Sequence, residues 1–133
     1  MKLYILLASI TLLATACTDT KKQEKEALSK VIEIHDKAMA HDEQAVRNKM
    51  LLDSLIKNNA DEAAKVTPVV NSLSIADKAM EDWMHQFNAD NTGKSHEEVM
   101  QYLDDQKKKV SKINNQLATA VNQSNQLIST LKK

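Results

Sequence analysis

Met and His are the side chains of this chain whose chemistry best fits a functional site. The chain contains six Met and four His. Thioether sulfur and imidazole nitrogen bind soft metals, copper(I) above all, and also haem iron. The candidate ligands are His35, Met39, Met80, Met84 and Met100. A fold that brought them into one layer would suit a copper or haem carrier.

A hydrophobic core accounts for the same residues without any ligand. Met commonly fills irregular gaps in cores, and the chain has no Met-x-x-Met repeat that would pair two sulfur atoms. No two His lie four positions apart, which argues against zinc. We therefore expect no metal or cofactor and keep the carrier as the alternative.

Signatures of catalysis and of nucleic-acid binding are missing from the sequence. It shows no nucleophile paired with a base, no Gly-rich phosphate loop and no acids placed for hydrolysis. The 18 basic and 18 acidic residues are balanced and form no clustered basic face. We expect neither an enzyme nor a nucleic-acid-binding protein.

An apolar stripe in the middle of the chain carries the bulkiest side chains. Its members recur at steps of three and four, the spacing of one helix face: Val69, Leu73, Ala76, Met80, Trp83 and Phe87. The stripe ends on the only Trp and the only Phe, so this end is expected to be well packed. His85 follows Trp83 by two positions and is expected to point away.

The beginning of the chain has the pattern of an export signal. Lys2 precedes an apolar run over 3–14, which is too short to span a membrane, and small residues follow it up to Cys17. This resembles the lipobox of bacterial lipoproteins, in which the Cys becomes the lipid-bearing N-terminus. Ala16 matches the small residue required before the Cys, whereas Ala14 stands where Leu is favoured.

We therefore expect a signal peptide over 1–16, a lipidated Cys17 with a tether over 17–24, and a folded domain over 25–133. Ordinary cleavage at the same bond is the alternative, because Ala14-Thr15-Ala16 also fits a signal-peptidase site. Both routes predict export. Lipidation predicts a membrane anchor at Cys17 in the bacterial envelope, with the outer membrane as the expected location.

Helices are the only elements that the remaining sequence favours. The whole chain has one Gly and one Pro, which is typical of an all-α protein. The first helix is expected over about 21–57. Its apolar positions recur about twice per turn: Leu28, Val31, Ile32, Ala38, Met39, Ala45, Val46, Leu52 and Ile56. One central heptad position there reads Leu28, His35, Asp42, Lys49 and Ile56. The polar members are expected to fix register, as single polar core residues do in bundles. A polar site built from His35 and Asp42 is the alternative, and His41 is expected to be solvated.

The second helix is expected over about 61–89, with a kink near Pro68. Thr67 and Pro68 together also form a good helix start, so a beginning at 67 stays open. The segment 89–94 has the composition of a loop.

A third helix over 95–131 is predicted to begin with a capping box formed by Ser95 and Glu98. His96, in its first turn, is expected to be exposed. Its heptad stripe contains Val99, Leu103, Gln106, Val110, Ile113, Leu117, Ala120, Ser124, Leu127 and Leu131. Such a stripe must be buried against the other helices or against another subunit.

Short turns between neighbouring helices predict an all-α fold, an antiparallel three-helix bundle. Counting along the helices places Trp83 near the level of His35. The strongest core positions are expected to be Leu73, Trp83, Phe87, Val110 and Leu117.

Two segments together carry a family resemblance. His35-Asp36-x-x-Met39 and the segment 76–87, with its Trp-Met-His-x-Phe, resemble small helical lipoproteins of the Bacteroidota that bear the label viral A-type inclusion protein. The resemblance implies a lipid-anchored helical protein and no activity.

These observations favour a binding or scaffolding module in the cell envelope, with an envelope protein or a second copy as partner. The alternative is the copper or haem carrier. A further alternative is a structural tether, similar to the murein-linked lipoprotein, with Lys132 and Lys133 at the cell wall.

Overall fold

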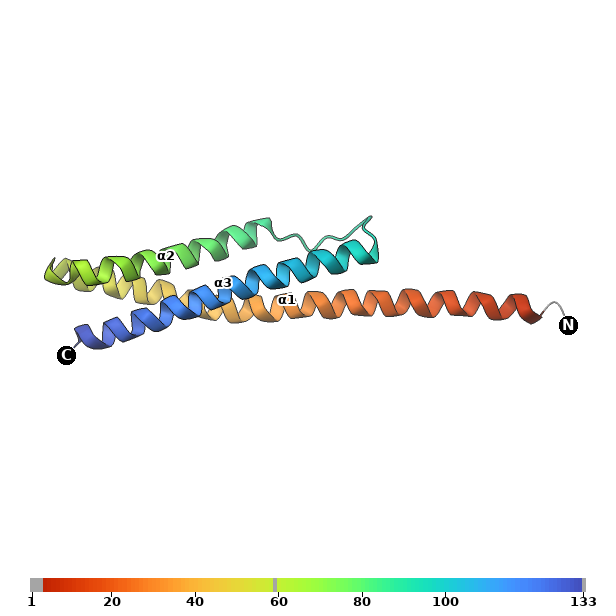
Figure 1. The fold of residues 1–133 in the computed structure, drawn as a ribbon, viewed down its shortest axis with the longest axis horizontal. Helices are drawn as coiled ribbons and strands as arrows, with labels where there is room; N and C mark the ends of the chain where they lie inside the picture. Colours follow the sequence, from red (N-terminus) through yellow and green to blue (C-terminus); the bar gives the residue numbers. More distant parts are fainter. Residues whose placement is uncertain (1–3, 59, 133) are drawn as a thin grey trace.

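Three long helices make up the fold. The structure, a computed structural model, describes residues 4–58 and 60–132, and side-chain surroundings for 19–57 and 61–132. The helices are α1 (Tyr4–Asn58), α2 (Ala63–Gln86) and α3 (His96–Leu131), with a short 3₁₀ turn, η1 (Ala60–Glu62), before α2. Figure 1 shows α2 returning along α1, and α3 running beside both in the direction of α1. The predicted antiparallel three-helix bundle is confirmed.

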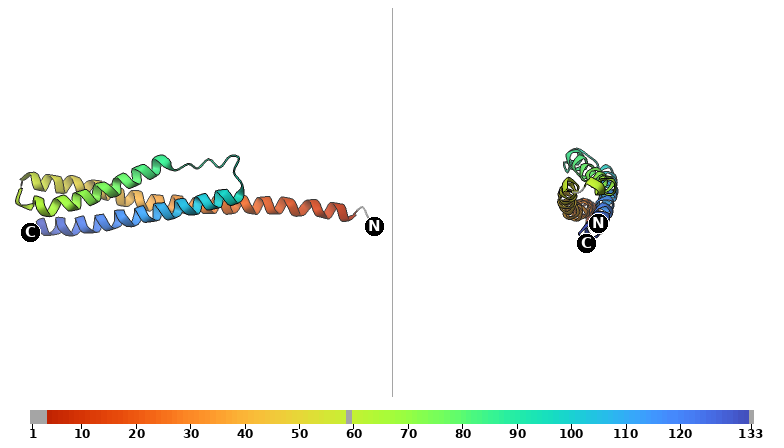
Figure 2. Two further views of the ribbon diagram at one scale, coloured as in Figure 1. Left: turned by 45° about the horizontal axis from the view of Figure 1, so that its top comes forward. Right: turned by 90° about the vertical axis from the view of Figure 1, so that its left-hand side faces the viewer.

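The first helix begins much earlier than expected. It starts at Tyr4 instead of near residue 21, because no Gly or Pro interrupts the chain before that point. The expected tether over 17–24 is therefore helical. Figures 1 and 2 show the beginning of α1 extending beyond the other two helices. No helix of the described chain has an apolar stretch long enough to cross a membrane.

The expected lipid attachment site lies where side chains are not described. The signal-peptide prediction covers 1–16, of which 1–3 lie outside the described residues. The side chain of Cys17 also lies outside them. Both expectations stay predictions.

The second helix passes through its proline. It begins at Ala63, so the alternative start at 67 is wrong. Pro68 lies inside the helix, where it has no N–H for the Ala64 carbonyl. The hydroxyl of Thr67 donates to the Ala63 carbonyl at 2.8 Å, so it does not cap the helix. The kink expected at Pro68 stays a prediction.

The loop between α2 and α3 begins earlier than predicted. The helix ends at Gln86 and Phe87 is extended, with φ −69° and ψ 128°. The Asn88 backbone N–H donates to the Tyr102 hydroxyl at 2.9 Å, and the Asn88 side chain accepts from the Asp90 N–H at 2.8 Å. Side-chain oxygens thus accept hydrogen bonds from backbone N–H groups that a continuing helix would have bonded internally, and α2 ends before them.

The capping box that starts α3 is confirmed. The Ser95 hydroxyl accepts from the Glu98 backbone N–H at 3.3 Å, and the Glu98 carboxylate accepts from the Ser95 N–H at 2.7 Å. The Ser95 N–H also holds the pKa of Glu98 below its usual range.

The core follows the predicted stripe of α3 closely. The residues from Val99 to Ser124 that were assigned to it are all buried, whereas Leu127 and Leu131 are half-buried at its end. The core predictions Leu73, Trp83, Val110 and Leu117 are confirmed as buried, and Phe87 is half-buried.

The most buried line of α1 consists of predicted apolar positions but lies beside the predicted central line. Its most buried positions are Val31, Ala38, Ala45 and Leu52, seven residues apart. The predicted central line through His35, Asp42 and Lys49 is only half-buried, and so lies at the edge of the interface. Ala38 and Ala45 have small side chains, so the neighbouring helices can pack closely against the line that contains them. Larger side chains at these positions would prevent this close packing.

Two His predictions are wrong. His41, expected to be solvated, is half-buried, and its Nδ1 lies 2.9 Å from Asn114 Oδ1 on α3. His96, expected to be exposed, is half-buried with its Nδ1 2.9 Å from a carboxylate oxygen of Glu24. The cause is the same in both cases. α1 and α3 run in parallel along most of their shared length, so polar residues beside the apolar stripe meet across the interface.

A buried polar cluster lies further along the same interface. The amide of Asn48, only 4% exposed, donates to Ser124 Oγ and to Asn125 Oδ1, each at 2.7 Å. Gln44 donates to Asn48 Oδ1 at 2.8 Å. The indole N–H of Trp83 donates to the buried Gln106 Oε1 at 2.9 Å, which joins α2 to α3.

Candidate functional site

The predicted meeting of His35 and Trp83 is confirmed. Their ring centroids lie 5.9 Å apart. Trp83 stacks on Phe87 at 5.0 Å, and Phe87 on Tyr102 at 6.2 Å. His35 Nδ1 also lies 3.0 Å from Asp36 Oδ1. An aromatic row therefore crosses from α1 over the end of α2 to α3.

A cleft of about 420 Å³ opens beside this row. His35, Trp83, Met84 and Phe87 line it, together with Val31, Ile32 and Asp36. Met84 is 40% exposed here. Of the five candidate ligands, only His35 and Met84 share this cleft.

The other candidate ligands lie elsewhere. Met80 is fully buried in the core, and Met39 is half-buried against it. Met100 lines a separate cleft of about 310 Å³ between α1 and α3. Within the described residues, no three His, Cys, Asp or Glu side chains converge as a metal site would require. Counting along the helices thus located the His35–Trp83 level, whereas Met39, Met80 and Met100 do not line the cleft beside it.

His35 and Asp42, the residues of the alternative polar site, have different neighbours. His35 contacts Asp36 and Trp83, whereas Asp42 faces Asp77 on α2. Burial raises the pKa of Asp42 to about 6, and the nearby Asp77 carboxylate adds to the rise. The Oδ1 atom of Asp42 is buried and finds no hydrogen-bond partner in the part of the chain that the structure describes.

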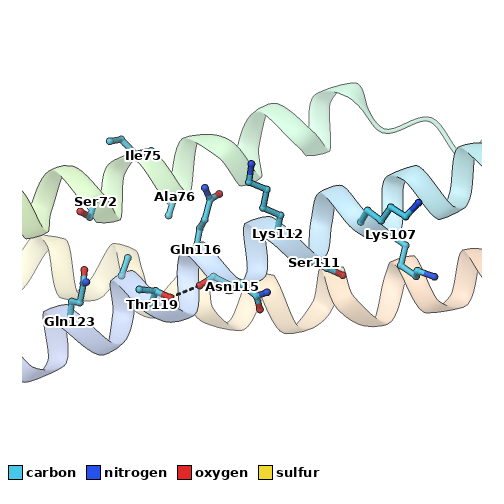
Figure 3. A pocket seen from close by; sticks show the side chains of 12 residues that line it. Ser72, Ile75, Ala76, Lys107, Ser111, Lys112, Asn115, Gln116, Thr119 and Gln123 are labelled. Atoms are coloured by element: carbon cyan, nitrogen blue, oxygen red, sulfur yellow. Dashed lines mark hydrogen bonds between the residues drawn. The ribbon is translucent and has the colours of Figure 1, made fainter.

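A groove with a volume of about 750 Å³ lies between α2 and α3 (Figure 3). From α2 it receives Ser72, Ile75 and Ala76. Ile75 is 69% exposed, unusually so for a large apolar side chain in this fold. We call this hollow the α2–α3 groove.

The α3 side of the groove changes in character along its length. Three lysines lie at one end: Lys107, Lys108 and Lys112. Uncharged side chains line the rest: Ser111, Asn115, Gln116, Thr119, Ala120 and Gln123. Figure 3 shows Lys107 and Gln123 at opposite ends, and the Thr119 hydroxyl bonded to the Asn115 carbonyl at 2.8 Å. The groove therefore has a basic end and a neutral end.

Sequence reasoning missed this groove. A usable signal was present, because its α3 residues recur in pairs every four positions, beside the buried stripe. Most of these residues are polar, and polar residues beside a buried stripe commonly face solvent.

The chain matches no known protein-family model, no curated protein and no solved structure. The clefts, the aromatic row and the α2–α3 groove are therefore the grounds on which a role can be assigned.

Proposed function

We propose that this protein is a lipid-anchored binding or scaffolding module of the bacterial cell envelope, without catalytic activity. The α2–α3 groove is the observation that carries the binding role. Its volume lies in the range of ligand sites, and an exposed Ile75 stands at its edge. Exposed apolar residues beside a groove favour a docking surface.

The anchor is proposed from Cys17 and the export signal before it. The long α1 would then hold the bundle away from the membrane. His41 on α1 pairs with Asn114 at the middle of the groove's length. At 1.5 Å per residue, the groove would stand roughly 36 Å along the helix from Cys17.

Two experiments test the proposal. Replacing Cys17 by Ser should move the protein from the membrane fraction to the soluble fraction and remove the mass of the lipid. A wild-type protein that is already soluble and unlipidated would contradict the anchor.

Docking is tested by photocrosslinking in intact cells. A photoreactive residue at Gln116, inside the groove, should give a defined product that Ile75→Asp abolishes. The matched control site is Met50 on α1, which is 68% exposed and lies outside the groove. Equal products from Gln116 and Met50, or none from Gln116, would contradict a docking role.

A copper or haem carrier is the second candidate, because His35 and Met84 line one cleft. It predicts stoichiometric metal or a haem absorption band in protein purified from its own membranes. His35→Ala and Met84→Leu should each reduce that content. Met39→Leu, outside the cleft, is the matched control. Protein that is free of metal and colourless excludes the carrier.

A further inference from the structure

The basic end of the α2–α3 groove has no acidic side chain of its own. None of its lining residues is Asp or Glu. Asp104, just outside, binds Lys107 at 3.0 Å and Lys108 at 2.6 Å. Lys112 has no ion pair within the described chain. The Asp105 carboxylate also lies close enough to Lys108 to help raise its pKa, after the larger effect of Asp104. Two carboxylates thus face three ammonium groups, and this end of the groove carries a small excess of positive charge.

The shape of the groove suits a helix. Its α3 residues run from Lys107 to Gln123, about 24 Å at 1.5 Å per residue. A helix of about 16 residues has that length. Because the residues that line α3 recur every four positions, they form the straight ridge against which helices pack. Ala76 and Ala120 are small and would let a further backbone come close.

A second copy of this chain packed groove against groove does not complement the charge of the groove. If two such grooves faced each other, the lysines of one copy would meet lysines or uncharged side chains, never a carboxylate. An anionic membrane surface is also disfavoured. The groove runs along the bundle and would stand well away from a lipid on Cys17.

We propose that the α2–α3 groove binds an amphipathic helix of a partner protein, with carboxylates over Lys108 and Lys112 and apolar side chains beside Ile75. This inference rests on the proposed docking function and adds the chemistry of the partner. Helix-in-groove recognition is a common mode of peptide binding, with anchors at three- and four-residue spacing.

Two synthetic helical peptides of 16 residues provide the probe. Both carry Leu and Ala on one face, and they differ only in having Glu or Lys in their first two turns. Binding to the full-length protein in detergent is measured by fluorescence anisotropy. The Glu peptide should bind more tightly than the Lys peptide, and added salt should weaken it.

Variants of the groove decide whether the binding is located there. Lys108→Glu with Lys112→Glu should weaken the Glu peptide about tenfold, because two close ion pairs become repulsive. The same variant should gain affinity for the Lys peptide. The matched control is Lys109→Glu, an exposed neighbour outside the groove, which should change affinity less than about twofold. Ile75→Asp should weaken binding, whereas Met50→Asp should not.

Several results would overturn the inference. The first is that the Glu peptide fails to bind, and the second is that Lys109→Glu weakens its binding as much as the groove variant does. The third is that the groove lysines bind phosphatidylglycerol vesicles instead of the peptide, and the fourth is that the protein forms a dimer that Ile75→Asp dissociates. If the Gln116 crosslink persists while the Glu peptide does not bind, only the acidic-helix inference fails. If both are absent, the docking function fails with it.

Discussion

Asp42→Asn should stabilise the bundle at neutral pH and have little effect at acidic pH. Asp42 is half-buried on α1, with the carboxylate of Asp77 near it on α2. Asn keeps the size of the side chain but carries no charge at any pH. It therefore resembles the protonated form of Asp42.

The magnitude depends on the pKa of Asp42, which rises from 3.8 to about 6 on folding. The folded state holds this proton more tightly than the unfolded state does. The stabilisation is thus complete below pH 3.8 and is lost as the pH rises through 6. The full shift corresponds to about 3 kcal/mol. Solvent screening at this half-exposed site reduces the expected gain from Asp42→Asn to about 1 kcal/mol at pH 7.5.

Urea unfolding followed by circular dichroism at pH 4.5 and pH 7.5 gives the required free energies. The quantity to compare is the difference between Asp42→Asn and wild type at each pH, because carboxylates far from Asp42 titrate equally in both proteins. Asp105→Asn, at an exposed site on α3, controls for the loss of one charge. An Asp42→Asn difference that is the same at both pH values, or a less stable variant at pH 7.5, would refute the reasoning.

Three further substitutions test the polar contacts by the same urea assay. Asn48→Ala should lower the free energy of unfolding by about 2 kcal/mol, because it removes two buried hydrogen bonds to α3. A loss within the range of a surface substitution, about 0.5 kcal/mol, would contradict this. Trp83→Phe should cost about 1–2 kcal/mol by leaving Gln106 Oε1 without its donor. Adding Gln106→Met should recover part of that loss, and no recovery would assign the cost to packing instead. Ser95→Ala should cost about 1 kcal/mol by removing the cap of α3, and an unchanged midpoint would show that the capping box contributes nothing.

The sequence predicted α3 well because two independent signals agree there. Its apolar residues keep a heptad spacing from Val99 onward, and Ser95 with Glu98 marks where the helix begins. Each signal depends only on neighbours in the chain. Both can therefore be read without knowing what the helix packs against.

The buried face of α1 could not be read in the same way. Apolar residues occur on both sides of the true interface, and Ile32 and Val46 remain exposed. The face that is buried centres on Ala38 and Ala45, whose small size gives a weak hydrophobic signal. Which line of α1 residues becomes buried depends on how closely α3 packs against α1. That distance is a property of the assembled bundle.

The sites between helices needed the structure for a related reason. The nearness of Asp42 to Asp77 depends on the alignment of α1 with α2, and a shift of one turn would separate them. The α2–α3 groove is lined mostly by polar side chains of α3. Small polar residues on a helix give the same sequence pattern whether they face a groove or open water.

The polar pairs between α1 and α3 also determine how the two helices are aligned along their length. Glu24–His96, His41–Asn114 and Asn48–Ser124 lie at unequal intervals along the two helices. Sliding one helix by a heptad, about 10.5 Å, would still place apolar residues against apolar residues but would part all three pairs. The two helices therefore have one favoured lengthwise alignment. The offset between α1 and α3 is then fixed, so the bundle has a defined length.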